Sequence, residues 1–379
     1  MSGYKHSEAG VIPNDWDVDI IENVAQVTTG ERNTQDKIED GSYPFFVRSQ
    51  TIERINSYSY DGEAVLTAGD GVGTGKIFHY INGKFEAHQR VYRIYNFSNR
   101  VNGYLFYLYF SENFFNRIMQ MTAKSSVDSV RKDMITRMSI PFPTNQDEQQ
   151  SIVSAFKDID ELIIGLKKII KKKLYIKQSI MQKLLTGKRR LPGFHSKWTE
   201  EKLGDLLTYE QPTRYLVKNK FYNDENDTPV LTPGKTFILG YTDELFGIFS
   251  NIPVIIFDDF TTATKYVDFP FKIKSSAIKI LKPKNNSVNL KFIYEQFQLI
   301  KFTISDHKRH WISDYQELKF KIPQDIEEQT AIANIFIDID FEITELQNLM
   351  NKTQDLKKGM SQQLLTGKMR FEIIKNNLF

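Results

Sequence analysis

The sequence predicts an α+β protein made of two related halves, each a mixed globular domain followed by one long helix. A stretch near the middle of the chain recurs near its end, because Ser179–Lys188 and Gly359–Lys368 share the ending Leu-Leu-Thr-Gly-Lys. The two stretches lie 180 positions apart in a chain of 379 residues. Such a repeat calls for a two-fold architecture before any other. A heptad pattern and short apolar runs then assign the helices and strands.

The long helices are predicted from apolar residues that recur at alternating steps of four and three. This is the spacing of a coiled-coil seam. The seam residues are Ile152, Phe156, Ile159, Ile163, Leu166 and Ile170 in the first copy and Ile332, Phe336, Ile339, Ile343, Leu346 and Met350 in the second. Gly187 and Gly367 stand where each helix would end, and a lysine follows each, which is a C-cap signal.

We expect the two helices to pack on each other within one chain, because neither could keep such a seam in water. If a local two-fold axis relates the halves, the helices run antiparallel. The alternatives are a coiled coil between chains and a seam buried in a larger core. The predicted boundaries are 1–145 for the first globular domain, 146–190 for the first helix, 191–325 for the second domain, 326–371 for the second helix and 372–379 for a tail.

Within the domains, short apolar runs predict buried strands that recur in both halves. They cover residues 43–47, 64–66 and 140–143 in the first half and residues 228–231, 254–257 and 320–323 in the second. Residues 77–95 predict a hairpin with Asn82-Gly83 as its turn. Asn102 is predicted to cap the helix after it, and residues 288–294 repeat that helix. The apolar scaffold repeats and the polar residues between do not, which indicates two related sites for two different ligands.

Composition excludes several kinds of protein. There is no cysteine, so disulfides and thiolate metal sites are excluded. We expect a cytoplasmic protein, because no secretory segment opens the chain and no run of eighteen apolar residues occurs. The net charge is only +3, yet ten Lys or Arg and no acid lie between Lys167 and Arg190. That stretch indicates either a solvated face or a surface for phosphate or an acidic partner.

No catalytic motif was found. The glycine loop at residues 69–76 lacks the spacing of a phosphate-binding P-loop and of a dinucleotide fingerprint, so a loop between strands is the favoured interpretation. There is no motif of a methyltransferase, a helicase or a serine hydrolase, and the six histidines lack metal-ligand spacing. We therefore expect no catalytic, cofactor-binding or metal-binding residues on this chain.

The duplicated helices resemble a known family. Glu148-Gln149, Asp158-Ile-Asp160 and the Leu-Leu-Thr-Gly-Lys ending, with their copies 180 positions later, are similar to the central and distal conserved regions of type I restriction–modification specificity subunits. The globular segments resemble the two target-recognition domains of that family. The resemblance covers nearly the whole chain, and its specific part is the duplicated helix signature.

The resemblance implies a DNA-reading subunit that is not itself an enzyme. Each domain would read one half of a bipartite site in double-stranded DNA, and the helix pair would fix the unread spacer. Two modification subunits would bind S-adenosylmethionine, and restriction subunits would use ATP and Mg. Half-sites one helical turn apart are about 34–36 Å apart, within reach of helices this long. The alternatives are a related complex with one fused catalytic partner and a coiled-coil scaffold that does not bind DNA.

The family does not fix which residues contact DNA, so candidates come from polar residues that follow strands and loops. Arginine and lysine favour guanine, and glutamine favours adenine. The candidates are Arg48, Gln50, Thr74, Lys76, Gln89, Arg90, Lys124 and Arg131 in the first half and Arg214, Thr232, Lys235, Thr262, Lys265, Arg309 and His310 in the second. For each, a phosphate contact or a plain surface position is an equal alternative.

Overall fold

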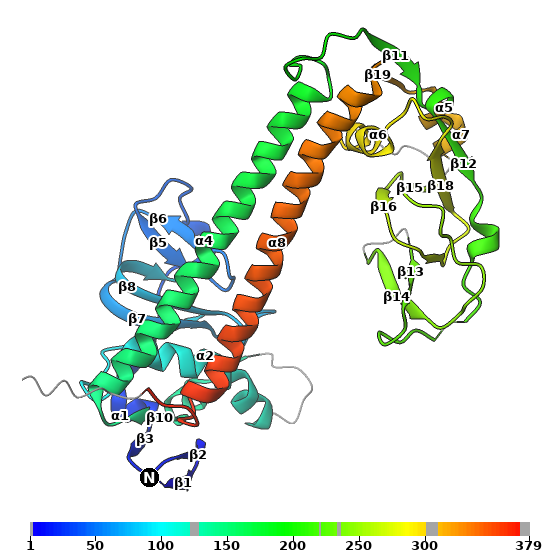
Figure 1. The fold of residues 1–379 in the computed structure, drawn as a ribbon. Helices are drawn as coiled ribbons and strands as arrows, with labels where there is room; N and C mark the ends of the chain where they lie inside the picture. The colour runs from blue at the N-terminus through cyan, green and yellow to red at the C-terminus, as the bar shows by residue number, and fades with distance from the viewer. Residues whose placement is uncertain (1–2, 122–128, 220, 233–235, 301–309, 372–379) are drawn as a thin grey trace, which may run out of the picture. The chain divides into compact units, whose positions relative to one another are not determined.

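The computed structural model describes residues 3–121, 129–219, 221–232, 236–300 and 310–371. It divides into two compact units, one formed by Met1–Leu166 with Leu349–Phe379 and the other by Lys167–Asn348. Each unit contains one mixed globular domain and one half of each long helix (Figure 1). The predicted fold class is confirmed. The division falls within the helices, so each helix contributes to both units.

The two long helices are α4 (Gln146–Leu184) and α8 (Ile326–Leu364), each of 39 residues. At 1.5 Å per residue each is about 58 Å long. In the first unit Lys357 Nζ lies 2.6 Å from Asp160 Oδ1, and in the second Lys177 Nζ lies 2.6 Å from Asp340 Oδ1. These two ion pairs are copies related by the 180-residue offset. In each unit the two helices run side by side in opposite directions, as predicted (Figure 1).

The predicted seam is largely buried, and its outer positions belong to the domain cores as well. Phe156 joins a core cluster that includes Leu364 and residues of the first domain, and Phe336 joins a cluster with Leu184 in the second unit. The buried seam residues are Ile152, Phe156, Ile159, Ile163, Leu166, Ile170, Ile332, Phe336 and Ile343, and the half-buried ones are Ile339, Leu346 and Met350. The seam therefore attaches each helix to its own domain in addition to pairing the helices.

Each long helix ends in the C-cap that the sequence predicted. Gly187 and Gly367 have positive φ values of 69° and 67°, a conformation that glycine adopts without strain. The N–H of Gly187 donates to Leu184 O, and that of Gly367 donates to Leu364 O, both at 3.3 Å. The two ends are therefore built alike.

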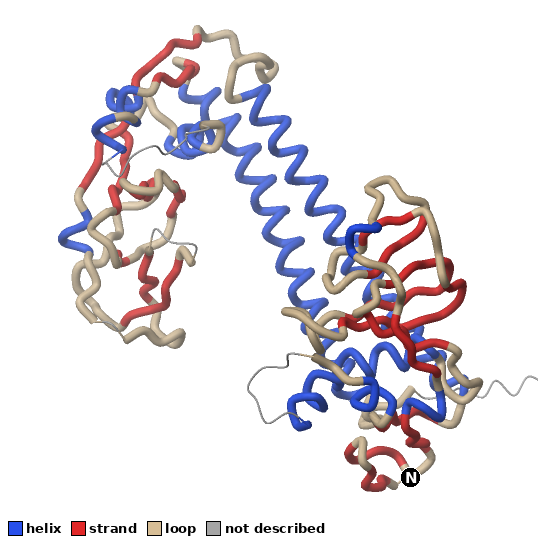
Figure 2. Tube along the Cα trace, turned by 180° about the vertical axis from the view of Figure 1, so that it is seen from behind, coloured by secondary structure: helices blue, strands red, loops and turns tan. Residues whose placement is uncertain are grey.

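The first domain contains a six-stranded sheet, whose strands are among those drawn in red in Figure 2. The strand order is β4-β9-β7-β8-β5-β6. Helix α2 (Gly103–Met121) packs on the sheet through aromatic residues, with Phe78 edge-on to Phe110 and Phe114. The strands of this sheet are β4 (Gln26–Thr29), β5 (Tyr43–Phe46), β6 (Glu53–Ile55), β7 (Tyr60–Ala68), β8 (Phe78–Ala87) and β9 (Val91–Tyr95). The remaining elements are β1 (Tyr4–Ser7), β2 (Gly10–Pro13), β3 (Trp16–Ile20), α1 (Ile21–Val24), η1 (Thr34–Asp36), α3 (Lys132–Thr136) and β10 (Ser139–Pro143).

The predicted hairpin over residues 77–95 is wrong. Strand β8 runs straight through Asn82 and Gly83, and the turn lies at residues 88–90. The partner of β8 is β7, which pairs with it from Tyr60–Phe85 to Thr67–Phe78. Pairing with a distant strand over this length outweighs the local preference of Asn-Gly for a turn.

The described strands of the second domain form three sheets. The first has the order β12-β18-β15-β16, the second has the order β14-β13-β17, and the third pairs β11 with β19. The strands are β11 (Trp198–Lys202), β12 (Leu207–Glu210), β13 (Thr228–Leu231), β14 (Ile238–Thr242), β15 (Val254–Asp258), β16 (Thr264–Val267), β17 (Lys272–Ile273), β18 (Ile278–Pro283) and β19 (Lys319–Pro323). The short helices are α5 (Leu203–Leu206), η2 (Pro212–Tyr215), α6 (Leu290–Phe297), α7 (His310–Ser313) and η3 (Tyr315–Glu317).

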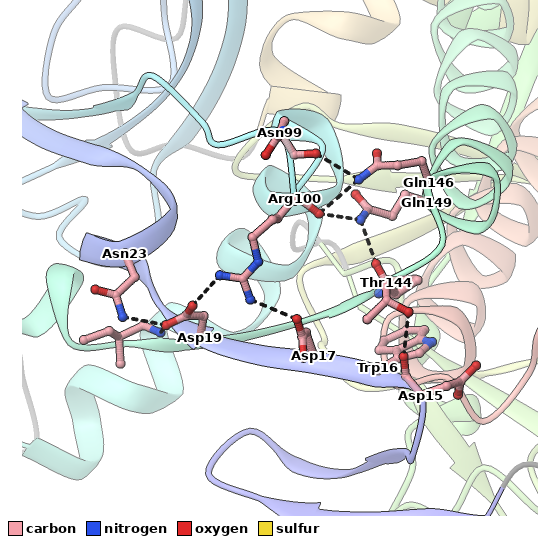
Figure 3. A network of polar contacts seen from close by, with 12 residues as sticks. Asp15, Trp16, Asp17, Asp19, Asn23, Asn99, Arg100, Thr144, Gln146 and Gln149 are labelled. Atoms are coloured by element: carbon pink, nitrogen blue, oxygen red, sulfur yellow. Dashed lines mark hydrogen bonds and ion pairs between the residues drawn. The ribbon is translucent and has the colours of Figure 1, made fainter.

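A buried glutamine fixes the entry of each long helix. Gln149 is fully buried, and its amide nitrogen donates to Arg100 O at 2.7 Å (Figure 3). The same nitrogen donates to Pro143 O at 2.7 Å, and the amide oxygen accepts from Asn102 N. Gln329 forms the same three kinds of contact with Ser287, Pro323 and Asn289. Asn102 in turn caps α2, as predicted, by accepting from Tyr104 N at 2.9 Å.

Around Gln149, a network of ion pairs and hydrogen bonds holds strand β3 of the first domain. Arg100 donates to Asp17 at 2.9 Å and to Asp19 at 2.7 Å, both on β3 (Figure 3). Gln146 donates to the carbonyl oxygen of Asn99 at 3.0 Å. The start of α4, the chain before α2 and strand β3 are therefore joined.

A buried glutamate binds the end of the opposite helix in each unit. Glu148 accepts from Trp16 Nε1 at 3.3 Å and from Arg370 Nε at 2.8 Å. Glu328 accepts from Trp198 Nε1 at 3.4 Å and from Arg190 Nε at 2.9 Å. Both carboxylates are at most 2% exposed, so charge-assisted bonds compensate their burial. In the described ranges, no helix is long and apolar enough to cross a membrane.

Candidate nucleic-acid interface

Backbone hydrogen bonds join three loops of the first domain at one end of its sheet. The N–H of His88 donates to Phe46 O at 2.9 Å, which joins the β8–β9 turn to the end of β5. Gly69 N donates to Arg90 O at 2.8 Å, and Val130 N donates to Gly69 O at 2.7 Å. The end of β7 is therefore tied both to that turn and to the segment before α3. Side chains on these loops are held by the sheet.

The same loops surround a polar hollow of about 550 Å³. Its walls carry more polar than apolar groups and include predicted contact residues. The lining residues are Thr29, Gly69, Asp70, Gln89, Arg90, Tyr92, Ser129, Val130, Arg131 and Lys132. The structure thus brings Arg131 to the same hollow as Gln89 and Arg90, which lie more than 40 positions earlier in the sequence. A basic, hydrogen-bonding hollow of this kind suits a nucleic-acid backbone or base edge.

Asp70 joins two of the predicted arginines. Its Oδ1 lies 2.8 Å from Arg48 Nη1, and its Oδ2 lies 3.5 Å from Arg90 Nη1. The side chains of Arg48 and Arg90 are 43% and 63% exposed, and that of Asp70 is 24% exposed. One carboxylate therefore orients two guanidinium groups that face solvent.

The other exposed polar candidates of this domain have different surroundings. Gln89 Nε2 donates to Asn33 Oδ1 at 2.6 Å, and Arg131 Nε lies 3.3 Å from Asp133 Oδ1. Gln50 is exposed two positions after Arg48. Lys76 is exposed, and its ammonium lies 5.1 Å from the centre of the Phe115 ring.

Thr74 does not fit its predicted role as a DNA contact. The residue is 3% exposed, and its hydroxyl donates to Gly71 O at 2.5 Å. The hydroxyl closes the glycine loop from inside, so it is not presented to a ligand.

Two histidines of the first domain have lowered pKa values, which favours the neutral form of each ring. Burial lowers the pKa of His88, and the positive charge of Arg48 lowers it further. His88 Nδ1 accepts from Arg90 N at 2.9 Å, which requires an unprotonated nitrogen. Burial also lowers the pKa of His79, whose Nε2 lies 3.0 Å from Ser49 O. These rings support the loops that carry Arg48 and Arg90.

The matching loop of the second domain has a buried polar core. Asp259, at the place of Asp70, is 2% exposed; its Oδ1 accepts from Trp311 N at 2.9 Å and its Oδ2 lies 3.5 Å from Lys279 Nζ. Asp258 accepts from Phe260 N at 3.1 Å. These carboxylates shape the loop, and their partners in the described part of the chain are backbone groups, the Thr261 hydroxyl and the buried Lys279.

His310 also does not fit its predicted role as a DNA contact. The residue is 1% exposed. Its backbone N–H donates to Asp259 O at 3.0 Å, and Nδ1 of its ring lies 2.9 Å from Asp314 Oδ2. The ring therefore anchors helix α7 under the loop.

Three candidates of the second domain lie around Phe237 and the start of β16. Thr262 lines a hollow of about 360 Å³ together with Lys265 and Gln298. Lys265 is exposed, with its ammonium 5.8 Å from the centre of the Phe237 ring. Thr232 N donates to Phe237 O at 3.0 Å. Thr262 has a φ of 58°, which is unusual for threonine and marks a constrained loop.

The remaining candidates lie elsewhere or cannot be placed. Arg214 is exposed in η2, one position before Tyr215, whose hydroxyl donates to Glu210 at 2.6 Å. Lys124, Lys235 and Arg309 lie outside the described residues.

Sequence reasoning missed Asp70 and Lys132 as parts of the hollow. An acid is not an obvious candidate for contact with a polyanion, so Asp70 is recognised only when its two arginine partners are seen. The one signal in the sequence was its place directly after an apolar run in a glycine-rich loop.

Comparison with known proteins relates the first half of this chain to a family. Residues 13–175 match the family model described as the type I restriction modification DNA specificity domain. That match covers less than half of the chain. The type I restriction enzyme EcoR124I/EcoR124II specificity subunit of Escherichia coli is 45% identical over 175 residues, which are 44% of this chain and 43% of that protein. The chain thus matches less than half the length of that relative.

Two further similarities extend over nearly the whole chain. The putative type I restriction enzyme MjaX specificity subunit of Methanocaldococcus jannaschii is 25% identical over 97% of this chain and 96% of that protein. The crystal structure of the type I restriction–modification S subunit from M. genitalium has a TM-score of 0.71 at 16% identity, and the match covers 92% of this chain and 96% of that one. At this identity the structural likeness establishes the fold.

Proposed function

We propose that this chain is the DNA sequence-specificity subunit of a type I restriction–modification enzyme, and that each globular domain reads one half of a bipartite target. One observation carries the proposal. The contacts that hold the scaffold, such as those of Gln149 and Gln329, are repeated in both halves, whereas the exposed side chains on matching loops differ. A duplicated scaffold with different surfaces is suited to reading two different sequences.

The helix pair is proposed to set the spacer between the half-sites and to dock two modification subunits. Several large apolar side chains remain exposed on the two helices, including Ile164 at 64%, Tyr175 at 61% and Phe341 at 66%. Large exposed apolar side chains on these helices are suited to contact with a protein partner. Part of the basic stretch is already neutralised, because Lys173 and Lys177 pair with Glu342 and Asp340 of α8.

The chemistry is proposed to reside on partner subunits in the cytoplasm. The modification subunits would bind S-adenosylmethionine and methylate adenines that are flipped out of the duplex. Restriction subunits would use ATP and Mg. The chain itself would supply the sequence preference. Its net charge of +3 suggests weak binding by the isolated chain, with the partners completing the grip on DNA.

The test is a map of methylated bases in the source genome with and without this gene. The proposal predicts a gapped, two-part adenine motif that disappears on deletion. If the map is unchanged, the chain is assembled in vitro with its modification subunit and assayed on a library of duplexes. Assembly without any sequence preference would reject the proposal in favour of a scaffold that does not read DNA.

A further inference from the structure

We propose that Asp70 is a positioning residue that aims Arg48 at a guanine in the half-site read by the first domain. This inference rests on the proposed function and deepens it. It names the pair of residues that discriminates and the kind of base pair, G·C, that they select. The observation behind it is the shared carboxylate between Arg48 and Arg90 at the rim of the hollow.

The charge of the cluster favours a base over a phosphate. Two guanidinium groups and one carboxylate leave a net charge of +1, and the carboxylate lies within 2.8 Å of Arg48. A phosphate at Arg48 would meet that negative charge at close range. The O6 and N7 atoms of guanine are acceptors without net charge, so Asp70 penalises them less.

The geometry of Arg48 leaves donors for a two-bond contact. A guanidinium has five N–H donors, and Asp70 engages Nη1 of Arg48. Among the described residues, Asp70 is the only acid that pairs with Arg48. The remaining donors can form the two parallel bonds to guanine O6 and N7 that define the preferred arginine contact. Arg90 is more exposed and lies 3.5 Å from Asp70, so it remains available to bind the phosphate backbone of the DNA.

The backbone that carries Arg48 and Asp70 is held in place by its neighbours, and discrimination between base pairs requires such rigidity. Arg48 directly follows Phe46 and Val47, which are 2% and 6% exposed. Asp70 follows Gly69, whose N–H and C=O are both bonded to neighbouring loops. The direction of Arg48 is therefore set by the fold and by Asp70 together.

Among the described residues of the second domain, no acid orients two exposed arginines in this way, which makes the inference specific to one half-site. Asp259 occupies the matching loop, but it is 2% exposed and is engaged by Lys279 and the backbone of Trp311. Substitution of Asp70 should therefore change the selection of one half of the target only.

The experiment uses the full chain assembled with its modification subunit. Methylation rates are measured on the cognate duplex and on duplexes in which each G·C pair of either half-site is replaced in turn. Binding to an unrelated duplex is measured over a range of salt concentrations. For Asp70→Asn we expect discrimination at one G·C pair of one half-site to fall roughly 5- to 100-fold. Binding to unrelated DNA should be equal or stronger, because a negative charge is removed.

Two further variants complete the design. Arg48→Lys keeps the charge but lacks the fork, so it should lose discrimination at the same base pair. Asp61→Asn removes an exposed acid near the other end of β7, so it should strengthen unrelated binding as Asp70→Asn does and leave discrimination unchanged. Folding of Asp70→Asn is judged by its thermal transition. If that variant does not fold, the discrimination measured for Arg48→Lys decides whether the inference holds.

The possible outcomes separate the two levels of the argument. Unchanged discrimination at every G·C pair in Asp70→Asn and Arg48→Lys overturns the role of Asp70, as does a first half-site without a G·C pair. A wild-type complex without any two-part preference overturns the proposed function itself. Weaker binding to all duplexes with unchanged discrimination would identify Arg48 as a phosphate contact and also overturn the inference.

Discussion

At the scale of residues, buried polar side chains determine how the loops of this protein are presented. Glu148, Gln149 and their copies could be found in the sequence because they repeat, but their partners could not. Arg190 and Arg370 lie just beyond the helix ends, and each binds a glutamate more than 130 positions away. No local pattern contains that information. The sequence also could not show that Thr74 and His310 turn inward, because burial of a polar residue depends on distant neighbours.

The first domain should lose stability as the pH falls from 7.5 to 5.5. The pKa of His88 and that of His79 are lowered by burial, so the unfolded chain takes up protons below about pH 6.5 that the folded chain does not. The contribution of these rings is therefore complete above pH 6.5 and is lost below it. Carboxylates with lowered pKa, such as Asp19, act at lower pH and contribute little in this window.

A His88→Asn variant isolates one of these rings. The amide oxygen can still accept from Arg90 N, but the side chain does not titrate. The urea midpoint of the variant should fall less than that of the wild type between pH 7.5 and 5.5. Equal decreases in both proteins would remove His88 as a source of the pH dependence.

At the scale of elements, the repeat was the most reliable guide to structure and local turn preference the least. Both long helices and both C-caps were predicted, because a periodic pattern over many turns has few alternatives. The Asn82-Gly83 turn was predicted wrongly, because β7 offers a long partner strand that the local sequence does not reveal. The distribution of the described strands of the second domain among three sheets likewise depends on long-range pairing.

The two C-cap glycines should differ in their response to alanine. Both require a left-handed backbone, which costs a residue with a Cβ about 1–2 kcal/mol. A Cβ at Gly187 would lie 3.2 Å from the Trp198 ring, whereas one at Gly367 would lie 2.4 Å from Pro13 Cγ. Gly367→Ala should therefore lower the free energy of unfolding more than Gly187→Ala, by about 1 kcal/mol or more. Urea denaturation checks the order, and a larger loss for Gly187→Ala would contradict it.

In the second unit, four charged side chains that pair in a closed ring join α6 to the long helices. Glu295 is fully buried and lies 2.7 Å from Lys291 Nζ and 3.2 Å from Lys177 Nζ. Both lysines also pair with Asp340, at 3.1 and 2.6 Å. At the matching positions the first unit has Tyr104, whose hydroxyl donates to Asp160 at 3.0 Å, and the buried apolar Leu108.

Removal of one charge from this ring should lower the free energy of unfolding, whereas replacement of two members together should restore a large part of it. Glu295→Leu alone leaves two partly buried lysines with one acid and should cost about 3–5 kcal/mol of unfolding free energy. Adding Lys291→Tyr copies the Tyr104 and Leu108 arrangement and should recover a large part of that loss. A double variant no more stable than Glu295→Leu in urea denaturation would show that the two joints are not interchangeable.

At the scale of the whole molecule, the account is that one scaffold was used twice to read two half-sites. The sequence predicted the duplication and the fold class, because both follow from long patterns. Individual contact residues were less predictable, since they lie on loops whose sequences do not repeat. The structure gathers Gln89, Arg90 and Arg131 at one hollow, where Asp70 also pairs with Arg48. It leaves Arg214 apart from the loop that holds Thr262 and Lys265.

The most direct test of this account is a methylation map made with a chimaera. Residues 1–145 are replaced by the first domain of another family member, and the chimaera is expressed with the modification subunit of this chain. The account predicts that one half of the methylated motif changes while the other half and the spacer length stay the same. A change in both halves, or an unchanged motif, would contradict the claim that each domain reads its own half-site.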